Sequence, residues 1–282
     1  MAVSLFSLRT WLKIHGALLV LLCVVALEWR ALPNGKLRLS VLDVGQGDAI
    51  FIETPSGKQI LMDAGPDFSV LPQLAERMPK TDRSIDLLIL SHPHLDHLAA
   101  FPEIIRRYEI GAVLLAGMQY PGERYAEMLD EMAKRRIPII VADPAKDLDM
   151  GDGVVLDVLW PKPIYFGKQA NDDDVNNTSV ALRVLYKDQS VVLTGDMEEE
   201  EESKILRSGA DVRGTVLKVA HHGSKTSTST GFLLAVRPQL AIISAGRDNK
   251  FRHPSVEILD RLKHFHIPVR ITKDDGSIDL EW

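Results

Sequence analysis

Hydrophobic and polar residues along positions 37–282 alternate with the short periods of strands and amphipathic helices. Alternating or continuous apolar runs predict strands, and apolar residues spaced three and four apart predict helices. In the first half the predicted strands are 37–43, 49–53, 59–63, 85–90, 113–115 and 137–142, and the predicted helices are 70–78, 98–108 and 123–136. The largely apolar run from Ile85 to Leu90 indicates a central strand buried on both faces.

The second half is also strand-rich and then helical. Its predicted strands are 154–160, 180–186, 190–193, 216–220 and 240–244, and its predicted helices begin at 198, 232 and 255. Residues 269–272 and 278–281 predict a final hairpin, and 143–153 and 161–177 predict polar loops. Two such halves favour an α/β domain over 34–282, with two packed sheets and helices on both outer faces.

The first 33 residues have a different pattern. Arg9 and Lys13 come before or at the edge of an apolar run of about fourteen residues, 14–27, and Trp11 and Trp29 bracket it. The run is shorter than the roughly 20 residues that cross a bilayer as a helix. A basic flank before a short apolar core predicts an export signal, cleaved or retained as a membrane anchor, with the folded domain outside the cytoplasm. The alternative is a buried helix of the fold.

Composition and charge narrow the chemistry. The chain is 45% hydrophobic and 26% charged, as expected of a globular protein with a sizeable core. Its one cysteine, Cys23, lies in the leading apolar run, so the folded part has neither a disulfide nor thiolate ligands. The net charge is −6, so the chain as a whole does not have the excess of basic residues that is typical of proteins that bind DNA nonspecifically. A local basic groove, or a metal that neutralises phosphates, would still allow the chain to bind DNA.

The segment from His92 to His97 holds the strongest candidate chemistry. Three imidazoles and a carboxylate (His92, His94, Asp96 and His97) follow the strand 85–90. These are ligand types that Zn²⁺, Mn²⁺ and Fe²⁺ accept. In an extended segment His92 and His94 point the same way, and Asp96 and His97 can reach a second ion where a helix begins. The alternative is a His-rich surface loop.

Later strand ends carry further candidates. Asp196 ends a strand after Gly195, where a carboxylate can bridge two metals, although an Asp there is more often a turn residue. His221 and His222 follow another strand, and we expect one to bind metal and the other to serve the substrate or leaving group. Ser224 and Lys225 then offer a hydroxyl and a cation to an anionic oxygen such as phosphate. The alternative for this stretch is a polar turn into a helix.

His253, which precedes Pro254 in a loop between a strand and a helix, is a metal candidate or a structural residue. Together these motifs resemble the metallo-β-lactamase superfamily. The runs at 42–49, 61–65, 177–179, 193–196 and 218–227 look like the hydrolase domain of the ComEC competence proteins, in the same order along 37–282. This resemblance implies the αββα sandwich with two mixed sheets.

The resemblance also implies a two-metal site. Its ligands would be His92, His94, Asp96 and His97, with Asp196 bridging and either His221 or His253 completing the set. His222 would then serve the substrate or act as an acid, while Asp63 and Asp48 would support the ligands from behind. Where many relatives have a further His, this chain has Asn177, as in the ComEC type.

The expected function is therefore a metal-dependent hydrolase, with two Zn or Mn ions that generate a hydroxide for attack on a phosphodiester. Candidate substrates are DNA, a phosphorylated wall polymer or a small diester, with Asn177, Ser224 and Lys225 at the substrate. One alternative is a lactam, lactone or thioester hydrolase of the same fold. Another is a binding module without catalysis. The many membrane spans of the ComEC proteins have no counterpart in this chain, so their DNA-uptake role does not carry over whole.

Overall fold

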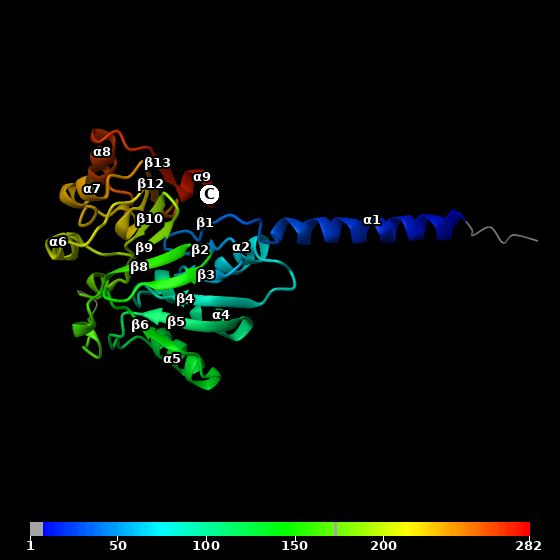
Figure 1. Cartoon of the computed structure of the whole chain (residues 1–282), viewed down its shortest axis with the longest axis horizontal. Coiled ribbons are helices and arrows are strands. Elements are labelled where there is room, and N and C mark those ends of the chain that lie inside the picture. The colour runs from blue at the N-terminus through cyan, green and yellow to red at the C-terminus, as the bar shows by residue number, and fades with distance from the viewer. Residues whose placement is uncertain (1–7, 172–173) are drawn as a thin grey trace, which may run out of the picture.

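A computed structural model of the chain describes residues 8–171 and 174–282 (Figure 1). Residues 1–7 of the predicted signal or anchor segment, and Asp172 and Asp173 of the predicted polar loop, lie outside the described residues. Within the described part, two seven-stranded sheets form the body of the molecule. Both sheets are mixed, because antiparallel strands at one side continue into parallel strands at the other.

The first sheet has the strand order β14-β1-β2-β3-β4-β5-β6. Its strands are β1 (Arg38–Val41), β2 (Ile50–Glu53), β3 (Gln59–Met62), β4 (Ser84–Ile89), β5 (Glu109–Leu115), β6 (Ile139–Val141) and β14 (Ile278–Glu281). The second sheet has the order β13-β12-β11-β10-β9-β8-β7. Its strands are β7 (Leu148–Gly151), β8 (Val154–Trp160), β9 (Ala181–Tyr186), β10 (Gln189–Leu193), β11 (Val216–Lys218), β12 (Leu240–Ile243) and β13 (Val269–Ile271).

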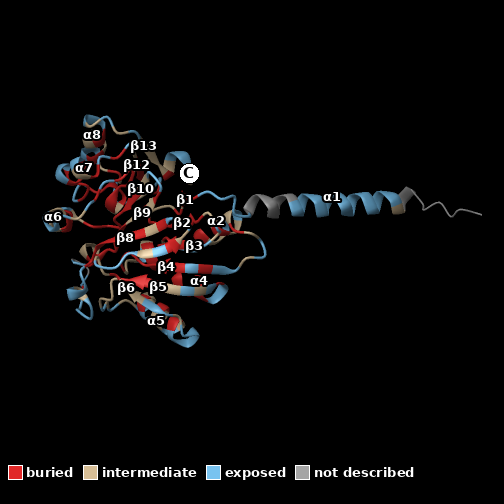
Figure 2. Ribbon diagram, viewed as in Figure 1, coloured by how far each residue is buried: buried red, intermediate tan, exposed pale blue. Residues whose placement is uncertain are grey.

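Three apolar clusters define the layers. The first, which includes Ile52 and Leu182, lies between the two sheets. The second packs the outer face of the first sheet against α2 (Val70–Arg77), α4 (Phe101–Arg107) and α5 (Glu123–Arg135). The third packs the second sheet against α6 (Glu199–Ser208), α7 (Thr230–Val236) and α8 (Val256–His264). Figure 2 shows buried residues within both sheets, and the helices packed on the outer face of each sheet confirm the predicted αββα sandwich.

Two local predictions were wrong. Residues 269–272 and 278–281 do not form a hairpin, because β13 pairs with β12 in the second sheet while β14 pairs with β1 in the first. The short helix α9 (Thr272–Asp275) carries the chain from one sheet to the other, and Ile278 is buried in the core between them. The predicted loop 143–153 contains β7, which pairs with β8.

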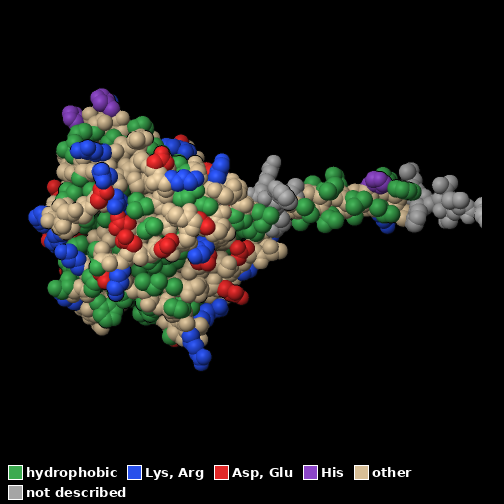
Figure 3. Space-filling view, in the orientation of Figure 1, with side chains coloured by type: hydrophobic (Ala, Val, Ile, Leu, Met, Phe, Trp, Pro, Cys, Tyr) green, Lys and Arg blue, Asp and Glu red, His purple; other side chains and the backbone are tan. Residues whose placement is uncertain are grey.

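The N-terminal helix α1 (Leu8–Ala31) projects away from the sandwich (Figure 1). Over residues 11–25 its side chains are exposed, as Figure 3 shows for the hydrophobic ones, and they include Leu18, Leu19 and Leu22. In residues 8–171 and 174–282, no helix combines the length and the hydropathy that crossing a membrane requires.

The candidate residues follow the carboxyl ends of strands in both sheets. Asp63 follows β3, His92 follows β4, Asp196 follows β10, and His221 follows β11. Parallel pairing of β3 with β4, and of β10 with β11, brings these ends to one edge of each sheet. Strand ends that meet at one edge are where sites form in folds with parallel strands.

Candidate metal centre

The segment after β4 places its imidazoles by a change from strand to helix. His94 has an extended backbone and caps the short helix α3 (Leu95–Leu98), which carries Asp96 and His97. His92 and His97 are buried, and His92 Nε2 lies 3.1 Å from His94 Nδ1. The extended segment thus directs His92 and His94 to a common point, as its spacing predicts.

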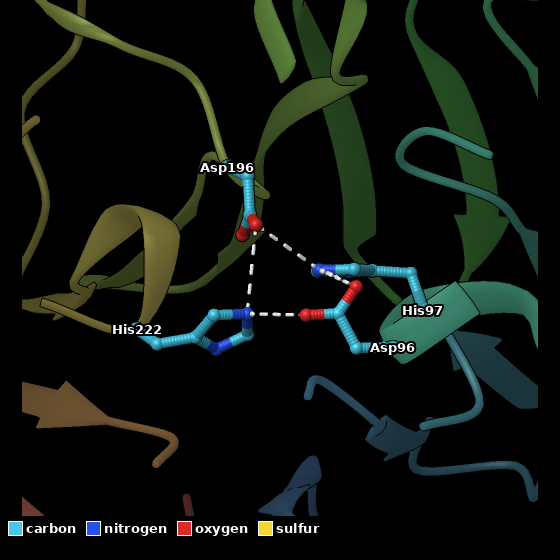
Figure 4. A group of neighbouring side chains, drawn as sticks. All are labelled: Asp96, His97, Asp196 and His222. Atoms are coloured by element: carbon cyan, nitrogen blue, oxygen red, sulfur yellow. Dashed lines mark ion pairs between the residues drawn. The ribbon is translucent and has the colours of Figure 1, made fainter. Parts of the chain in front are cut away.

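Four side chains from both halves of the sandwich converge beside this helix (Figure 4). His97 Nε2 lies 3.3 Å from Asp196 Oδ2, and His222 Nε2 lies 3.5 Å from the same oxygen. Asp96 completes the group, with Oδ2 3.3 Å from His222 Nε2 and Oδ1 4.0 Å from His97 Nε2. We call Asp96, His97, Asp196 and His222 the central cluster.

The central cluster fits a divalent cation. A tetrahedral site with bonds of 2.0–2.1 Å separates its ligand atoms by about 3.3 Å, close to the distances seen here. His97 Nε2, His222 Nε2 and Asp196 Oδ1 are buried and have no hydrogen-bond partner among the described residues. Buried polar atoms without a partner are costly, so their convergence fits a site that binds a cation. This donor set of imidazole and carboxylate suits Zn²⁺ or Mn²⁺.

Hydrogen bonds behind the rings set the direction of each imidazole. His97 Nδ1 lies 2.9 Å from Asp63 Oδ2, and His222 Nδ1 lies 3.0 Å from the carbonyl oxygen of Ser244. Because a carbonyl accepts and does not donate, and an ionised carboxylate does the same, both Nδ1 atoms carry the proton. When either ring is neutral, as a metal ligand must be, its lone pair is therefore on Nε2, the nitrogen that faces Asp196.

Asp196 also faces two more imidazoles. His92 Nε2 and His221 Nε2 each lie 3.9 Å from Asp196 Oδ2. One oxygen of the Asp196 carboxylate thus lies within 3.9 Å of four imidazole rings. Asp196 is reached by imidazoles from β4 and from β11, so it joins the two halves at the site.

The backbone around Asp196 depends on glycine. Gly195 has a positive φ of 53°, and a Cβ there would lie 2.9 Å from Ser91 Cβ and 3.0 Å from Ser179 Cβ. The next residue donates its backbone N–H to Ser179 Oγ at 3.1 Å. Gly195 therefore lets the chain turn against Ser91 and Ser179 and fixes where the Asp196 carboxylate emerges.

Backbone strain also marks the two adjacent histidines. His221 and His222 both have left-handed backbone conformations, with φ of 49° and 53°. Two successive non-glycine residues of this kind are held only where the surroundings enforce them, and such strain clusters at functional sites. The strained turn aims both rings at Asp196.

Charge sets the protonation of the cluster. Burial favours the neutral imidazole, but nearby carboxylates outweigh it and hold the pKa values of His97 and His222 well above the ordinary value. Burial would raise the pKa of Asp196, but His97 and His222 hold it well below its usual range. Burial and the neighbouring His97 lower the pKa of His92. A cation would displace protons from this cluster.

The other predicted residues lie around the cluster. His253 lies beside it, with its ring centroid 5.7 Å from that of His221, and burial lowers its pKa to about 4. Asn177 Oδ1 accepts the backbone N–H of Glu198, and Ser224 Oγ contacts Thr226 Oγ1, while Lys225 is exposed.

A cavity of about 460 Å³ opens onto the cluster. Its lining includes His94, His221 and His253, which sequence reasoning found, and Gln46, Leu95, Tyr120 and Phe251, which it missed. Phe251 stands two residues before His253, so its position beside a candidate ligand was a usable signal. Asn177, Ser224 and Lys225 do not line this cavity.

The αββα sandwich with this cluster at its strand ends is the fold of the metal-dependent hydrolases. The profile of the metallo-beta-lactamase superfamily matches residues 42–247, and the chain belongs to that superfamily. ComE operon protein 3 of Bacillus subtilis is 28% identical over 268 residues, covering 86% of this chain and 33% of that protein. Recombination protein 2 of Haemophilus influenzae is 30% identical over 269 residues, covering 94% and 31%. The chain thus spans about a third of the length of these relatives.

Solved structures share the fold at low identity. The metallo-beta-lactamase fold protein YhfI from Bacillus subtilis superposes with a TM-score of 0.56 at 15% identity, covering 88% of this chain and 100% of YhfI. CmlA, a diiron beta-hydroxylase from Streptomyces venezuelae, superposes with a TM-score of 0.56 at 14% identity, covering 89% and 55%. The fold therefore hosts different reactions, and the reaction must be argued from the site.

Proposed function

We propose that this protein is a metal-dependent phosphodiesterase that cleaves nucleic acid strands. The observation that carries the proposal is the set of buried, unpartnered imidazole and carboxylate atoms that converge on Asp196 at the base of an open cavity. The names of its relatives, which include recombination and competence proteins, support a nucleic acid substrate.

Asp96, His97, Asp196 and His222 would hold one ion, and His92 and His94 would hold a second with Asp196. Divalent ions in such sites supply polarisation of phosphoryl oxygens and activation of water. The protein itself would hold the metal ligands in place and supply a proton to the leaving oxygen. We assign that proton to His221, which lines the cavity and is less buried than His222.

The walls of the cavity suit a substrate with bases. Leu95 and Phe251 line it and are 63% and 55% exposed, and Tyr120 stands in the same wall. Leu95 and Tyr120 also line a neighbouring cavity of about 550 Å³, so a chain longer than one nucleotide has room. Aromatic side chains beside a phosphate site bind successive bases by stacking, at about 1–3 kcal/mol per base.

The test is a substrate panel on the whole chain loaded with Zn²⁺ or Mn²⁺. We expect hydrolysis of bis-p-nitrophenyl phosphate and of a single-stranded oligonucleotide, lost in Asp196→Ala. Nitrocefin and a lactone run beside them as controls for the alternative chemistry of the fold. Hydrolysis of either control without hydrolysis of any diester would overturn the proposal, as would inactivity with both metals.

We also propose that α1 directs the catalytic domain out of the cytoplasm, either as a cleaved export signal or as a retained membrane anchor. The exposed Leu and Val side chains along α1 support this, because water disfavours such a surface on a projecting helix. The test is fractionation of cells that express the whole chain, followed by protease treatment of intact cells. Recovery of protease-protected protein in the soluble cytoplasmic fraction would contradict it.

A further inference from the structure

Lys218 is a buried cation close to the central cluster that the proposed reaction does not use. It ends β11, it is 1% exposed, and its Nζ lies 2.6 Å from Asp48 Oδ2, which is equally buried. Nζ also donates to the carbonyl oxygen of Val219 at 3.1 Å. The pair joins the loop between β1 and β2 to the second sheet, across 170 residues of sequence.

The other oxygen of Asp48 faces a residue of the central cluster. Asp48 Oδ1 lies 3.4 Å from His222 Nδ1, the nitrogen that also donates to the carbonyl oxygen of Ser244. The opposite nitrogen, Nε2, faces Asp96 and Asp196. Asp48 therefore stands directly behind the ring that must point at the cation.

The same arrangement occurs behind His97. Asp63 contacts His97 Nδ1 with Oδ2, and its Oδ1 accepts the backbone N–H of Ser91 at 2.8 Å. In both places one carboxylate oxygen faces the imidazole and a donor holds the other. The donor is a backbone N–H behind His97 and the Lys218 ammonium behind His222.

We propose that Lys218 is a positioning residue that holds the Asp48 carboxylate behind His222, so that His222 Nε2 stays directed at the cation site. Without the ammonium, the buried Asp48 carboxylate would lose its nearest counterion, and it would rotate or draw in water to be solvated. Either change removes one of the two groups that face His222 Nδ1 and leaves only the Ser244 carbonyl oxygen behind the ring. Loss of such support behind a metal ligand weakens metal binding about 10- to 100-fold.

The experiment is zinc titration by calorimetry on the metal-free whole chain. Lys218→Met is compared with Arg183→Met, which breaks another largely buried ion pair, with Asp157, at 2.5 Å across β8 and β9. We expect zinc affinity to fall at least tenfold in Lys218→Met and to stay at the wild-type value in Arg183→Met. The control separates a general loss of stability from a loss at the site.

A double variant keeps the test decisive if Lys218→Met does not fold. Asp48→Ala with Lys218→Met removes both charges and leaves no buried ion unpaired, and we expect the same loss of zinc affinity. Wild-type affinity in either Lys218 variant, or an equal loss in Arg183→Met, would overturn the assignment. The inference rests on the metal site of the proposed function but not on the substrate. Failure of the wild type to bind either Zn²⁺ or Mn²⁺ would overturn both, whereas wild-type affinity in Lys218→Met would overturn only this one.

Discussion

Gly195→Ala tests whether the close packing before Asp196 builds the site. The variant adds one methyl group at a residue whose φ is +53°. That methyl would lie 2.9 Å from Ser91 Cβ and about as close to the side chain of Ser179. Since Ser179 Oγ accepts the backbone N–H of Asp196, any shift of Ser179 also moves the proposed bridging carboxylate.

The magnitude has two parts. A left-handed conformation costs an L-residue about 1–2 kcal/mol, and overpacking a buried site costs about 1–3 kcal/mol. Gly195→Ala should therefore lower the free energy of unfolding by about 2–5 kcal/mol. Gly209→Ala is the matched control, because Gly209 also has a positive φ, of 79°, but a Cβ there meets nothing within 4 Å. Gly209→Ala should therefore lower the free energy of unfolding only by the cost of the left-handed conformation, about 1–2 kcal/mol.

The assay is urea unfolding of both variants without metal, followed by zinc titration. We expect the Gly195 variant to be less stable than the Gly209 variant by about 1–3 kcal/mol, and to bind zinc at least tenfold more weakly. The Gly209 variant should bind zinc as the wild type does. Equal stability of the two variants, or unchanged zinc affinity in Gly195→Ala, would refute the packing argument.

Three further results are expected. Asp196→Asn should lower kcat/KM for a diester at least about 100-fold and bind fewer ions per chain, because one oxygen of Asp196 lies beside four imidazoles. Full activity of this variant would rule out the bridging role. The raised pKa values of His97 and His222 mean that the metal-free protein holds protons near neutrality, which a cation must displace. Zinc affinity should therefore rise with pH, by up to about tenfold per unit for each proton displaced, and a flat profile between pH 6 and 8 by calorimetry would contradict this. Phe251→Ala should raise the KM for a nucleoside p-nitrophenyl phosphate about 5- to 150-fold through lost stacking, and the KM for methyl p-nitrophenyl phosphate should not change. Phe166→Ala is the control, because Phe166 is also exposed but does not line the cavity. Equal effects of the two variants would exclude stacking on Phe251.

Local sequence patterns predicted most of the strands and helices but not the pairing of strands that lie far apart in the chain. Apolar alternation predicted both halves of the sandwich, since each strand must bury at least one face. The strand at 278–281 was predicted correctly but given the wrong partner. Its pairing with β1 joins Val41 to Ile278, and no local turn signal marks a contact of that length. A short separation from β13 suggested a hairpin, whereas burial of Ile278 between the sheets decides the pairing.

The candidate site was readable from sequence where ligand types cluster. His92 to His97 and Asp196 stand at strand ends, and their convergence follows from parallel pairing. The residues behind the ligands were harder to predict, because a lysine within an apolar strand, such as Lys218, is normally expected at the surface. Its burial is set by Asp48, which lies 170 residues earlier in the chain.

Asn177 contacts the segment that follows Asp196, and this contact bears on where His221 lies. Its side chain accepts the backbone N–H of Glu198, and Glu198 Oε1 then lies 3.6 Å from His221 Nδ1. The opposite nitrogen of His221 faces Asp196. Asn177 thus helps to place the Glu198 carboxylate beside the His221 imidazole. This linkage places His221 between the cluster and the cavity, where a group that exchanges a proton with the substrate is needed.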